Sequence, residues 1–470
     1  MRTRLKVHPN LTISQSGPQP GPQPGRRLVP LLLSTVLVAG CSSSEPSSDK
    51  PEPETGTPSS AAPRAAIGAG VTVGRVAPPA RAAAVKSVGA VVQRWVDAAY
   101  LTPSGDVAAA FPGFTPGAAE LAARDRGVTT FGGTADAELV PDASSIKVDL
   151  LGTEGKARGA TARVALTLDP EGEDKGATKI SGRLTLVPEG PGWRIFGYEL
   201  QRQSPDTRSR RVMAGDVGKE TVWILAVGSD ARRGQPVLRS RGDAIQMVGL
   251  NTRTGAATTI GVPRDSWVSI PGYGSNRINA ALYFGGPKAM GRTVGNLVGV
   301  QPDHVIVASF WGLSETVDAI GRIVVNSKRA FSDQYLQPGF RKGRNRINGP
   351  SAVNFSRIRK SLPGGDFDRS ANQQETLRAI QAAIGLGIAK PGFLETGAFA
   401  AHRKLETGMS ITEVFRIAQA VASIDPRKTS GCVVQGSIGN VNGASIVFPN
   451  TAAARRYGDD ARKDAQIKRC

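Results

Sequence analysis

The residues from Thr221 to Val227 form an almost unbroken apolar segment, TVWILAV, which constrains the fold more than any other segment. A strand with one face in water alternates apolar and polar residues, whereas an unbroken apolar strand is buried on both faces. Strand-like and helix-like segments then alternate along the chain, as in a sheet covered by helices on both sides. We therefore predict an α/β fold, a three-layer α/β/α sandwich, over residues 220–450.

The periodicity of apolar residues places the other elements of this sandwich. Apolar and β-branched runs predict strands at Ala244–Leu250, Thr258–Val262, His304–Phe310 and Arg322–Val325. Apolar residues three and four apart predict helices at Gly286–Leu297, Leu313–Ile320, Ser370–Ile388 and Ile411–Ile424. Asn442-Gly443, between the runs Cys432–Ser437 and Ala444–Phe448, predicts a hairpin because both residues tolerate positive φ.

A smaller α+β domain is expected before the sandwich, over residues 82–203. A helical stripe begins near Ala82 and contains Val88, Val92 and Trp95, and alternating runs follow as far as Leu200. This order loosely resembles the SnoaL-like cone fold, in which a curved sheet wraps a helix. We find no candidate site there and interpret the domain as a spacer or partner-binding module. Residues 204–219 are predicted to be a linker, and 451–470 a C-terminal tail.

The N-terminal region resembles that of a bacterial lipoprotein. Basic residues precede an apolar stretch from Leu28 to Gly40, which is shorter than the roughly 20 residues of a spanning helix. It ends at Val38-Ala39-Gly40-Cys41, which resembles a lipobox, so we predict a signal peptide at 1–40 and lipidation of Cys41. Residues 41–81 are predicted to be a disordered Ser/Pro-rich tether. The alternative is an uncleaved signal anchor with an incidental cysteine.

Charge and composition narrow the class of partner. The chain has 59 Lys and Arg against 39 Asp and Glu, a net charge of +20, which indicates a polyanionic partner. An anchored lipoprotein acts on the outer, extracytoplasmic face of the cytoplasmic membrane, so nucleic acid is not expected. The three Cys and three His are scattered, which disfavours structural zinc, haem and a His-based triad. The chemistry must therefore use Asp, Arg, Lys or hydroxyl groups.

Five charged segments of the sandwich lie where strands or helices begin or end. Asp230 follows the first strand and Asp243 precedes the next, so both are expected at one end of the sheet. Two nearby carboxylates suit Mg²⁺ or Mn²⁺, and Arg side chains bind phosphate oxygens bidentately. The segments are GSDAR with Asp230 and Arg232, RGD with Arg241 and Asp243, VPRDSW with Arg264 and Asp265, FSRIRK with Arg357 and Arg359, and GDFDRSANQQ with Asp366, Arg369 and Gln373.

Together these segments predict a site for a diphosphate with a bridging divalent metal. Each residue alone also has an ordinary structural explanation, such as a turn former or a solvated loop charge. The spacing of Arg357 and Arg359 places both on one side only if the chain is extended there. We therefore expect the preceding helix to end near Phe355.

The order of these segments resembles the LytR–CpsA–Psr family, from about Trp223 to Gln374. The resemblance covers ILAVGSDAR, RGDAI, IGVPRDSWVSIPGYG, RINAALYFGGPKAM, ETVDAIGRIVVN, INGPSAVNFSRIRK and GDFDRSANQQ. It implies an enzyme that transfers a glycopolymer from a polyprenyl-pyrophosphate carrier to peptidoglycan. The implied roles are metal binding by Asp230 and Asp243, catalysis by these two with Arg264 and Asp265, and pyrophosphate binding by Arg232, Arg241, Arg264, Arg357, Arg359, Arg369 and Gln373.

The resemblance leaves several points open. The base that deprotonates the acceptor sugar hydroxyl is Asp230, Asp243 or Asp265. An apolar tunnel for the carrier is implied, and Ala281–Phe284, Val305–Trp311 and Leu377–Ile388 are expected to line it, although a plain core fits these residues equally. A protein that binds lipid pyrophosphates without transfer, and a pyrophosphatase, are the alternative functions.

The cysteines suggest a disulfide bond. With Cys41 lipidated, Cys432 and Cys470 remain in an exported chain, where disulfides persist. A bridge between them closes a loop of about 38 residues and fixes the C-terminal tail to the sheet. The alternative is two unpaired thiols.

Overall fold

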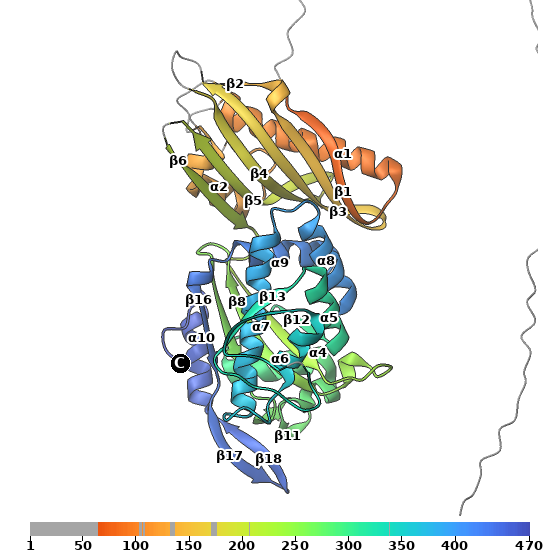
Figure 1. Ribbon diagram of the computed structural model, residues 1–470, viewed down its shortest axis with the longest axis vertical. Helices are drawn as coiled ribbons and strands as arrows, with labels where there is room; N and C mark the ends of the chain where they lie inside the picture. Colours follow the sequence, from red (N-terminus) through yellow and green to blue (C-terminus); the bar gives the residue numbers. More distant parts are fainter. Residues whose placement is uncertain are drawn as a thin grey trace, which may run out of the picture. The chain divides into compact units, whose positions relative to one another are not determined.

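The computed structural model describes residues 64–102, 106, 109–131, 137–170, 176–205, 207–337 and 339–470. The predicted signal peptide, Cys41 and the tether as far as residue 63 lie outside these residues. The described chain contains two domains built on separate six-stranded sheets, the N-terminal domain at 65–215 and the C-terminal domain at 221–470 (Figure 1). Within these ranges, no helix has the length and apolar character required to cross a membrane.

The N-terminal domain packs one long helix against its sheet, which confirms the predicted α+β architecture. Helix α1 (Pro78–Val96) buries Val88, Val92 and Trp95, the stripe predicted from the sequence. The strand order is β1-β3-β4-β5-β6, β2 pairs with β3, and only the β1–β3 pair is parallel. The strands are β1 (Ala66–Val76), β2 (Ala137–Leu139), β3 (Ser145–Pro170), β4 (Thr178–Glu189), β5 (Gly192–Ser204) and β6 (Thr207–Gly215), and two short helices are α2 (Pro116–Arg124) and α3 (Arg126–Thr129). The resemblance to the SnoaL-like fold stays a prediction.

Both predicted boundaries of this domain are wrong. Strand β1 occupies residues assigned to the tether, because its sequence AIGAGVTVGRV is rich in Ala and Gly and has little apolar contrast. Strand β6 occupies the predicted linker. It is an edge strand with exposed arginines, and its buried residues Val212, Ala214 and Gly215 are small or few, so its sequence has the polarity of a loop.

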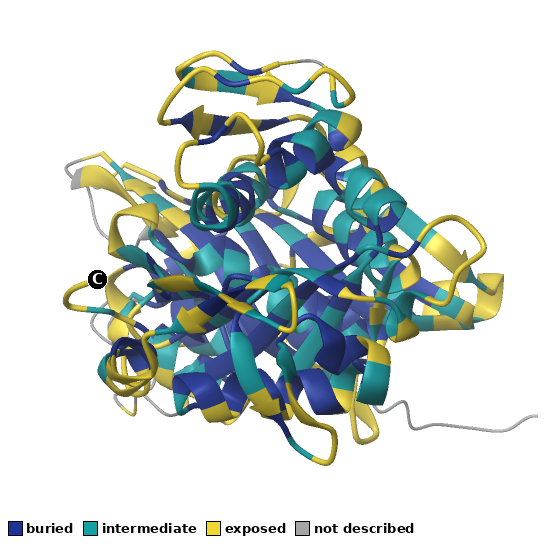
Figure 2. Cartoon of the chain, turned by 90° about the horizontal axis from the view of Figure 1, so that it is seen from below, coloured by how far each residue is buried: buried dark blue, intermediate teal, exposed yellow. Residues whose placement is uncertain are grey.

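The C-terminal domain is the predicted three-layer sandwich. Its sheet has the order β15-β12-β7-β8-β9-β16, with β7–β12 and β9–β16 parallel and the other pairs antiparallel. Its strands are β7 (Thr221–Ser229), β8 (Gly242–Asn251), β9 (Ala256–Gly261), β12 (His304–Ala308), β15 (Leu405–Thr407) and β16 (Thr429–Val433). The dark blue buried residues of Figure 2 are concentrated in the middle of the molecule, as expected for a sheet covered on both faces.

Different helices cover the two faces of this sheet. Leu225 and Val227 of β7 share a core with α4 (Ala280–Val298) and α10 (Thr451–Ala461). Ile224 and Ala226 face the helices of the other layer. That layer contains α5 (Phe310–Ala319), α6 (Gly349–Arg357), α7 (Asp366–Gly387), α8 (Phe393–Lys404) and α9 (Ile411–Ser423).

Two elements of this domain differ from the prediction. Strand β13 (Ile323–Ser327) pairs with β14 (Gly343–Ile347) in a separate two-stranded sheet and not with the central one. Helix α10 replaces most of the predicted C-terminal tail. Its buried face consists mainly of alanines with Tyr457, so the sequence lacks the large apolar residues that indicate docking.

Two small hairpins complete the domain. The predicted hairpin is present as β17 (Gly436–Val441) and β18 (Ala444–Pro449), with positive φ at Asn442 and Gly443, and it projects from the domain in Figure 1. Strands β10 (Trp267–Ile270) and β11 (Gly274–Arg277) form the second.

Candidate active site

The structure brings the two predicted metal-binding acids to one end of the sheet. Asp230 directly follows β7, and Asp243 is the second residue of β8. The Arg241 backbone N–H donates to Asp230 Oδ1 at 2.9 Å, and the Asp230 N–H donates to the Arg241 carbonyl at 2.9 Å. These bonds close the loop between the two strands and fix Asp230 near Asp243, close enough for the charge of Asp230 to raise the pKa of Asp243.

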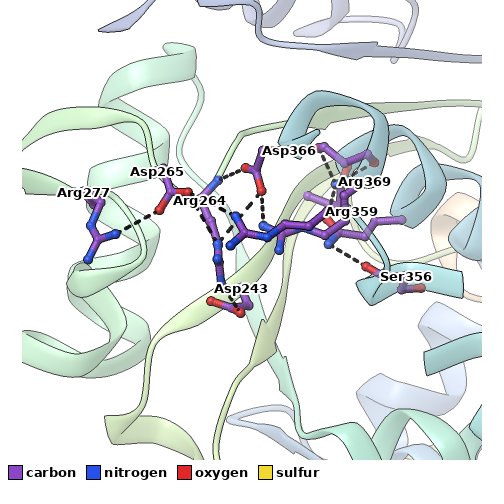
Figure 3. A network of polar contacts seen from close by, with 11 residues as sticks. Asp243, Arg264, Asp265, Arg277, Ser356, Arg359, Asp366 and Arg369 are labelled. Atoms are coloured by element: carbon purple, nitrogen blue, oxygen red, sulfur yellow. Dashed lines mark hydrogen bonds and ion pairs between the residues drawn. The ribbon is translucent and has the colours of Figure 1, made fainter. Parts of the chain in front are cut away.

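Arg264 lies at the centre of the charged cluster shown in Figure 3. Its guanidinium forms an ion pair with Asp243, and its Nε lies 3.6 Å from Asp265 and 4.0 Å from Asp366. Its backbone N–H donates to Asp366 Oδ2 at 3.1 Å. Arg264 follows β9 in sequence, so its contacts connect the end of that strand with β8 and with the first residue of α7.

Asp265 is surrounded by guanidinium groups. Arg277 lies 3.3 Å from one carboxylate oxygen, and Arg264 and Arg359 lie 3.6 and 3.9 Å from the other. An acid in contact with three guanidinium groups holds their side chains close together. Arg277 was not predicted as a site residue. It stands at the end of β11, within the RINAALYF block, and only the folded chain brings it to Asp265.

Arg357 and Arg359 lie at the C-terminal end of α6. The helix ends at Arg357, two residues later than predicted, and Ile358 is extended. The Arg357 guanidinium stacks 4.0 Å from the centre of the Phe310 ring, a contact that the sequence did not reveal. Burial, and then the positive charge of Arg232, lower the pKa of Arg357. The guanidinium groups of Arg357 and Arg232 therefore repel each other, as expected at a site where an anion binds between them.

The residues of α7 are more deeply buried than the other predicted ligands. Arg369 is 5% exposed and pairs with Asp366 one turn earlier. The Gln373 amide donates to the Ser356 carbonyl at 3.2 Å and accepts from Gln246 Nε2 at 3.1 Å. Direct contact of Gln373 with a pyrophosphate stays a prediction. Arg232 and Arg241 have exposed side chains at the rim of the cluster.

Asp243 has the properties expected of a metal ligand. Its Oδ1 is buried and accepts no hydrogen bond from any described residue, while its Oδ2 is paired with Arg264. Burial raises the pKa of Asp243, and Arg264 only partly offsets this. In the described ranges, no group of three or more His, Cys, Asp or Glu side chains is arranged around a metal position. Mg²⁺ requires no such group, because it binds through one or two carboxylates with phosphate oxygens and water.

An apolar cavity of about 350 Å³ lies between the sheet and helices α7, α8 and α9. Gln373 and Ser356, the neighbour of Arg357, line it, so the cavity adjoins the arginine cluster. Two of the three predicted tunnel segments contribute to its lining, through Ile306 and Ala308 and through Leu377, Ile380 and Ile384. The third prediction, Ala281–Phe284, is wrong, because α4 packs on the opposite face of the sheet.

Proteins with similar sequences are known. The chain is 33% identical over 177 residues to the polyisoprenyl-teichoic acid–peptidoglycan teichoic acid transferase TagU of Bacillus mycoides, covering 37% of this chain and 57% of that protein. It is 28% identical over 261 residues to TagU of Enterococcus faecalis, covering 54% and 83%. The chain thus spans little more than half the length of the Bacillus relative.

Solved structures and a family model were also compared with the chain. The crystal structure of TagV from B. subtilis shares 25% identity at a TM-score of 0.44, covering 53% of this chain and 96% of that one. The model of the LytR_cpsA_psr family matches residues 198–463, which is more than half of the sequence. The chain therefore belongs to the LytR_cpsA_psr family.

Proposed function

We propose that this protein transfers a glycopolymer, together with its linking phosphate, from a polyprenyl-pyrophosphate carrier to a peptidoglycan sugar hydroxyl during cell-wall assembly. One observation carries the proposal: the cluster of guanidinium groups around Asp243 adjoins a cavity with apolar walls. A lipid pyrophosphate has the matching chemistry, an anionic head and an apolar tail. Membership of the family, and relatives named as teichoic acid transferases, support the same substrate class.

The proposed reaction is a displacement at phosphorus. The acceptor hydroxyl oxygen forms a bond to the phosphorus that carries the polymer, the bond to the bridging oxygen breaks, and polyprenyl phosphate leaves. Arg264, Arg357 and Arg359 stabilise the negative charge that develops on the phosphoryl and leaving oxygens. The hydroxyl proton passes to a carboxylate. Asp265 already contacts three guanidinium groups, so Asp230 or Asp243 is the base that accepts the proton.

A divalent cation is part of the proposal. Asp230 and Asp243 would hold Mg²⁺ or Mn²⁺, and the unpaired Oδ1 of Asp243 is the atom that most favours this assignment. When bound, the metal supplies Lewis-acid stabilisation of the pyrophosphate oxygens. The carboxylates themselves orient Arg264 and keep the two strand ends together.

We propose that the protein works outside the cytoplasmic membrane and is held there by lipid on Cys41. The lipobox-like sequence before Cys41 supports this location. The disulfide bond between Cys432 and Cys470 supports it independently, because such bonds persist in oxidising compartments.

The test is a reconstituted transfer reaction. The purified protein is incubated with a polyprenyl-pyrophosphate glycan, Mg²⁺ and peptidoglycan fragments, and mass spectrometry detects a phosphodiester-linked product. Asp243→Asn is the inactive variant, and Asp459→Asn, an exposed acid on α10, is its matched control. Carrier binding without product would instead indicate a lipid-pyrophosphate binding protein. Release of phosphate products without transfer would indicate a pyrophosphatase.

A further inference from the structure

The N-terminal domain shares a hydrophobic core with helices α8 and α9 of the C-terminal domain. Phe196 of β5 packs edge-on against Phe415 of α9, with ring centres 5.8 Å apart. The family model begins at residue 198, so most of the N-terminal domain lies outside the matched region. The core contains Leu151, Val187 and Phe196 from the N-terminal domain, Leu394, Ala398, Val414 and Phe415 from the two helices, and Met409 from the segment between them.

Polar groups of the N-terminal domain hold the first turn of α8. The N-cap residue of this helix is Gly392, which has no side chain to cap it. Its backbone N–H instead donates to the carboxylate of Asp149, a residue of β3 that is 1% exposed, at 3.2 Å. A carboxylate at a helix N-terminus satisfies a free N–H and interacts favourably with the helix dipole. Thr161 of the same strand donates to the buried carboxyl group of Glu395 at 2.5 Å.

A second set of polar contacts fixes α9. The Gln419 side chain is fully buried, and its Nε2 donates to the carbonyls of Ala214 at 2.9 Å and Tyr198 at 3.4 Å. Its oxygen accepts from Arg183 at 3.3 Å. In the first turn of the helix, the Thr412 hydroxyl donates to the Arg158 carbonyl at 3.0 Å. The first turn and the C-terminal half of α9 are therefore both bonded to the N-terminal domain.

The same two helices form a wall of the apolar cavity. Leu394, Ala398, Met409 and Val414 line the cavity and also belong to the core shared with the N-terminal domain. This wall lies far from the arginines. Helix α7 begins beside them at Asp366 and reaches this core at Ile384. Ile384 follows Gln373 by 11 positions, which corresponds to about 16 Å along the helix.

We infer that the N-terminal domain, although none of its residues lines the cavity, determines which polyprenyl chain lengths the cavity accepts. By fixing α8 and α9, it sets the width of the cavity at the end where the distal isoprene units of the carrier lie. This inference rests on the proposed function. The domain thereby affects substrate specificity at a distance from the reacting groups. Asp149, Thr161 and Gln419 are the positioning residues, because their hydrogen bonds hold α8 and α9 in place.

The test compares binding of two lipid phosphates to the full chain, so it requires no transfer. Geranyl phosphate has a tail too short to reach Ile384, whereas the tail of undecaprenyl phosphate is long enough to extend past it. Gln419→Met keeps the side-chain volume but removes three hydrogen bonds to the N-terminal domain. We expect the affinity for undecaprenyl phosphate to fall about tenfold, and that for geranyl phosphate to stay unchanged.

Gln93→Met is the matched control, because Gln93 is buried in the N-terminal domain but bonds only within it. Thr161→Val is the second variant in case Gln419→Met does not fold, and it has the same expected effect. Hydrogen exchange of α8 and α9 should rise in both variants without ligand, and not in the control. Unchanged undecaprenyl phosphate binding in folded Gln419→Met overturns the inference. A wild-type chain that binds neither phosphate overturns the proposed function as well.

Discussion

Asp243 combines a central position in the proposed active site with an unfavourable environment. One of its oxygens pairs with Arg264, while the other is buried without a partner from the described chain. Burial raises its pKa above the ordinary value of 3.8. Between that value and the raised pKa the folded protein binds more protons than the unfolded one, so this group reduces stability as the pH rises. Ionised Asp243 therefore costs stability at neutral pH.

Asp243→Asn is expected to abolish metal-dependent turnover and to raise the melting temperature at pH 7. Asparagine cannot hold the metal as a carboxylate does, and a loss on the order of a hundredfold or more is expected. It also removes the cost of a buried charge, an advantage that disappears at pH values below the ordinary pKa of Asp. Turnover with and without EDTA, together with thermal melts at both pH values, checks this. Wild-type turnover insensitive to EDTA would refute the two-acid site.

Arg357→Ala is expected to weaken carrier binding. A charge-assisted contact to phosphate contributes roughly 1.5–3 kcal/mol, so the dissociation constant should rise by about 10- to 150-fold. Titration with undecaprenyl phosphate measures this. Arg403→Ala is the matched control, because Arg403 also stacks on a phenylalanine, Phe399, but lies on α8 away from the arginine cluster. Equal binding by the two folded variants would remove Arg357 from the site.

The elements of the C-terminal domain depend on close backbone approach as well as on side-chain packing. Helix α10 crosses α4 at Gly458, where an added Cβ would lie 2.1 Å from the Val298 carbonyl oxygen. A side chain there cannot fit without moving the helix. Gly385 of α7 has space for a Cβ, whose nearest neighbour would be the Ala422 carbonyl oxygen at 3.9 Å.

The same substitution is therefore expected to have opposite effects at these two glycines. Gly458→Ala should lower the free energy of unfolding by about 1–3 kcal/mol, because α10 must shift away from α4. Gly385→Ala should raise it by about 0.5–1 kcal/mol, since alanine costs less conformational entropy in a helix. Urea denaturation of both variants measures the two values. A neutral Gly458→Ala would mean that α10 does not pack closely on α4.

The elements that the sequence predicted well are those with large apolar residues at regular spacing. Helices α4, α5, α7 and α9 and the central strands lie close to their predicted positions. Strands β1 and β6 and helix α10 were missed, because their buried residues are mostly small or few. The acids and most arginines of the site were predicted from charges at strand ends. Arg277 and Phe310 were not, since their roles depend on contacts between segments distant in sequence.

At the scale of the whole molecule, a disulfide bond joins the last residue, Cys470, to Cys432 in β16, as predicted from the cysteine count. The bridge closes a loop that contains both the β17–β18 hairpin and α10. Other contacts hold the same C-terminal segment: the Lys463 carbonyl accepts from Thr221 and Asn251 at 2.9 Å each. The C-terminus is therefore fixed to the sheet at several points.

Reduction of this bond is expected to lower the free energy of unfolding by about 3–4 kcal/mol in the chain-entropy model. Urea denaturation of the oxidised protein and of protein whose disulfide has been reduced measures the difference in the free energy of unfolding. Thiol labelling of the denatured, unreduced protein, with Cys41 lipidated, should detect no free cysteine. Two reactive cysteines would rule the bridge out, and equal stability in both conditions would contradict the expected contribution.

The position of the bridge also affects how copies of the protein behave toward one another. Strand β16 is an edge strand of the six-stranded sheet in the C-terminal domain. An uncovered edge strand can pair with the same strand of another molecule. The C-terminal segment lies over this strand, since the Ile467 N–H donates to the Ser430 hydroxyl at 3.1 Å and Cys470 is bonded to Cys432. Protein produced in a reducing cytoplasm lacks this bridge and should therefore self-associate while its helices are still folded. Light scattering would detect the self-association, and circular dichroism would show that the helices are retained.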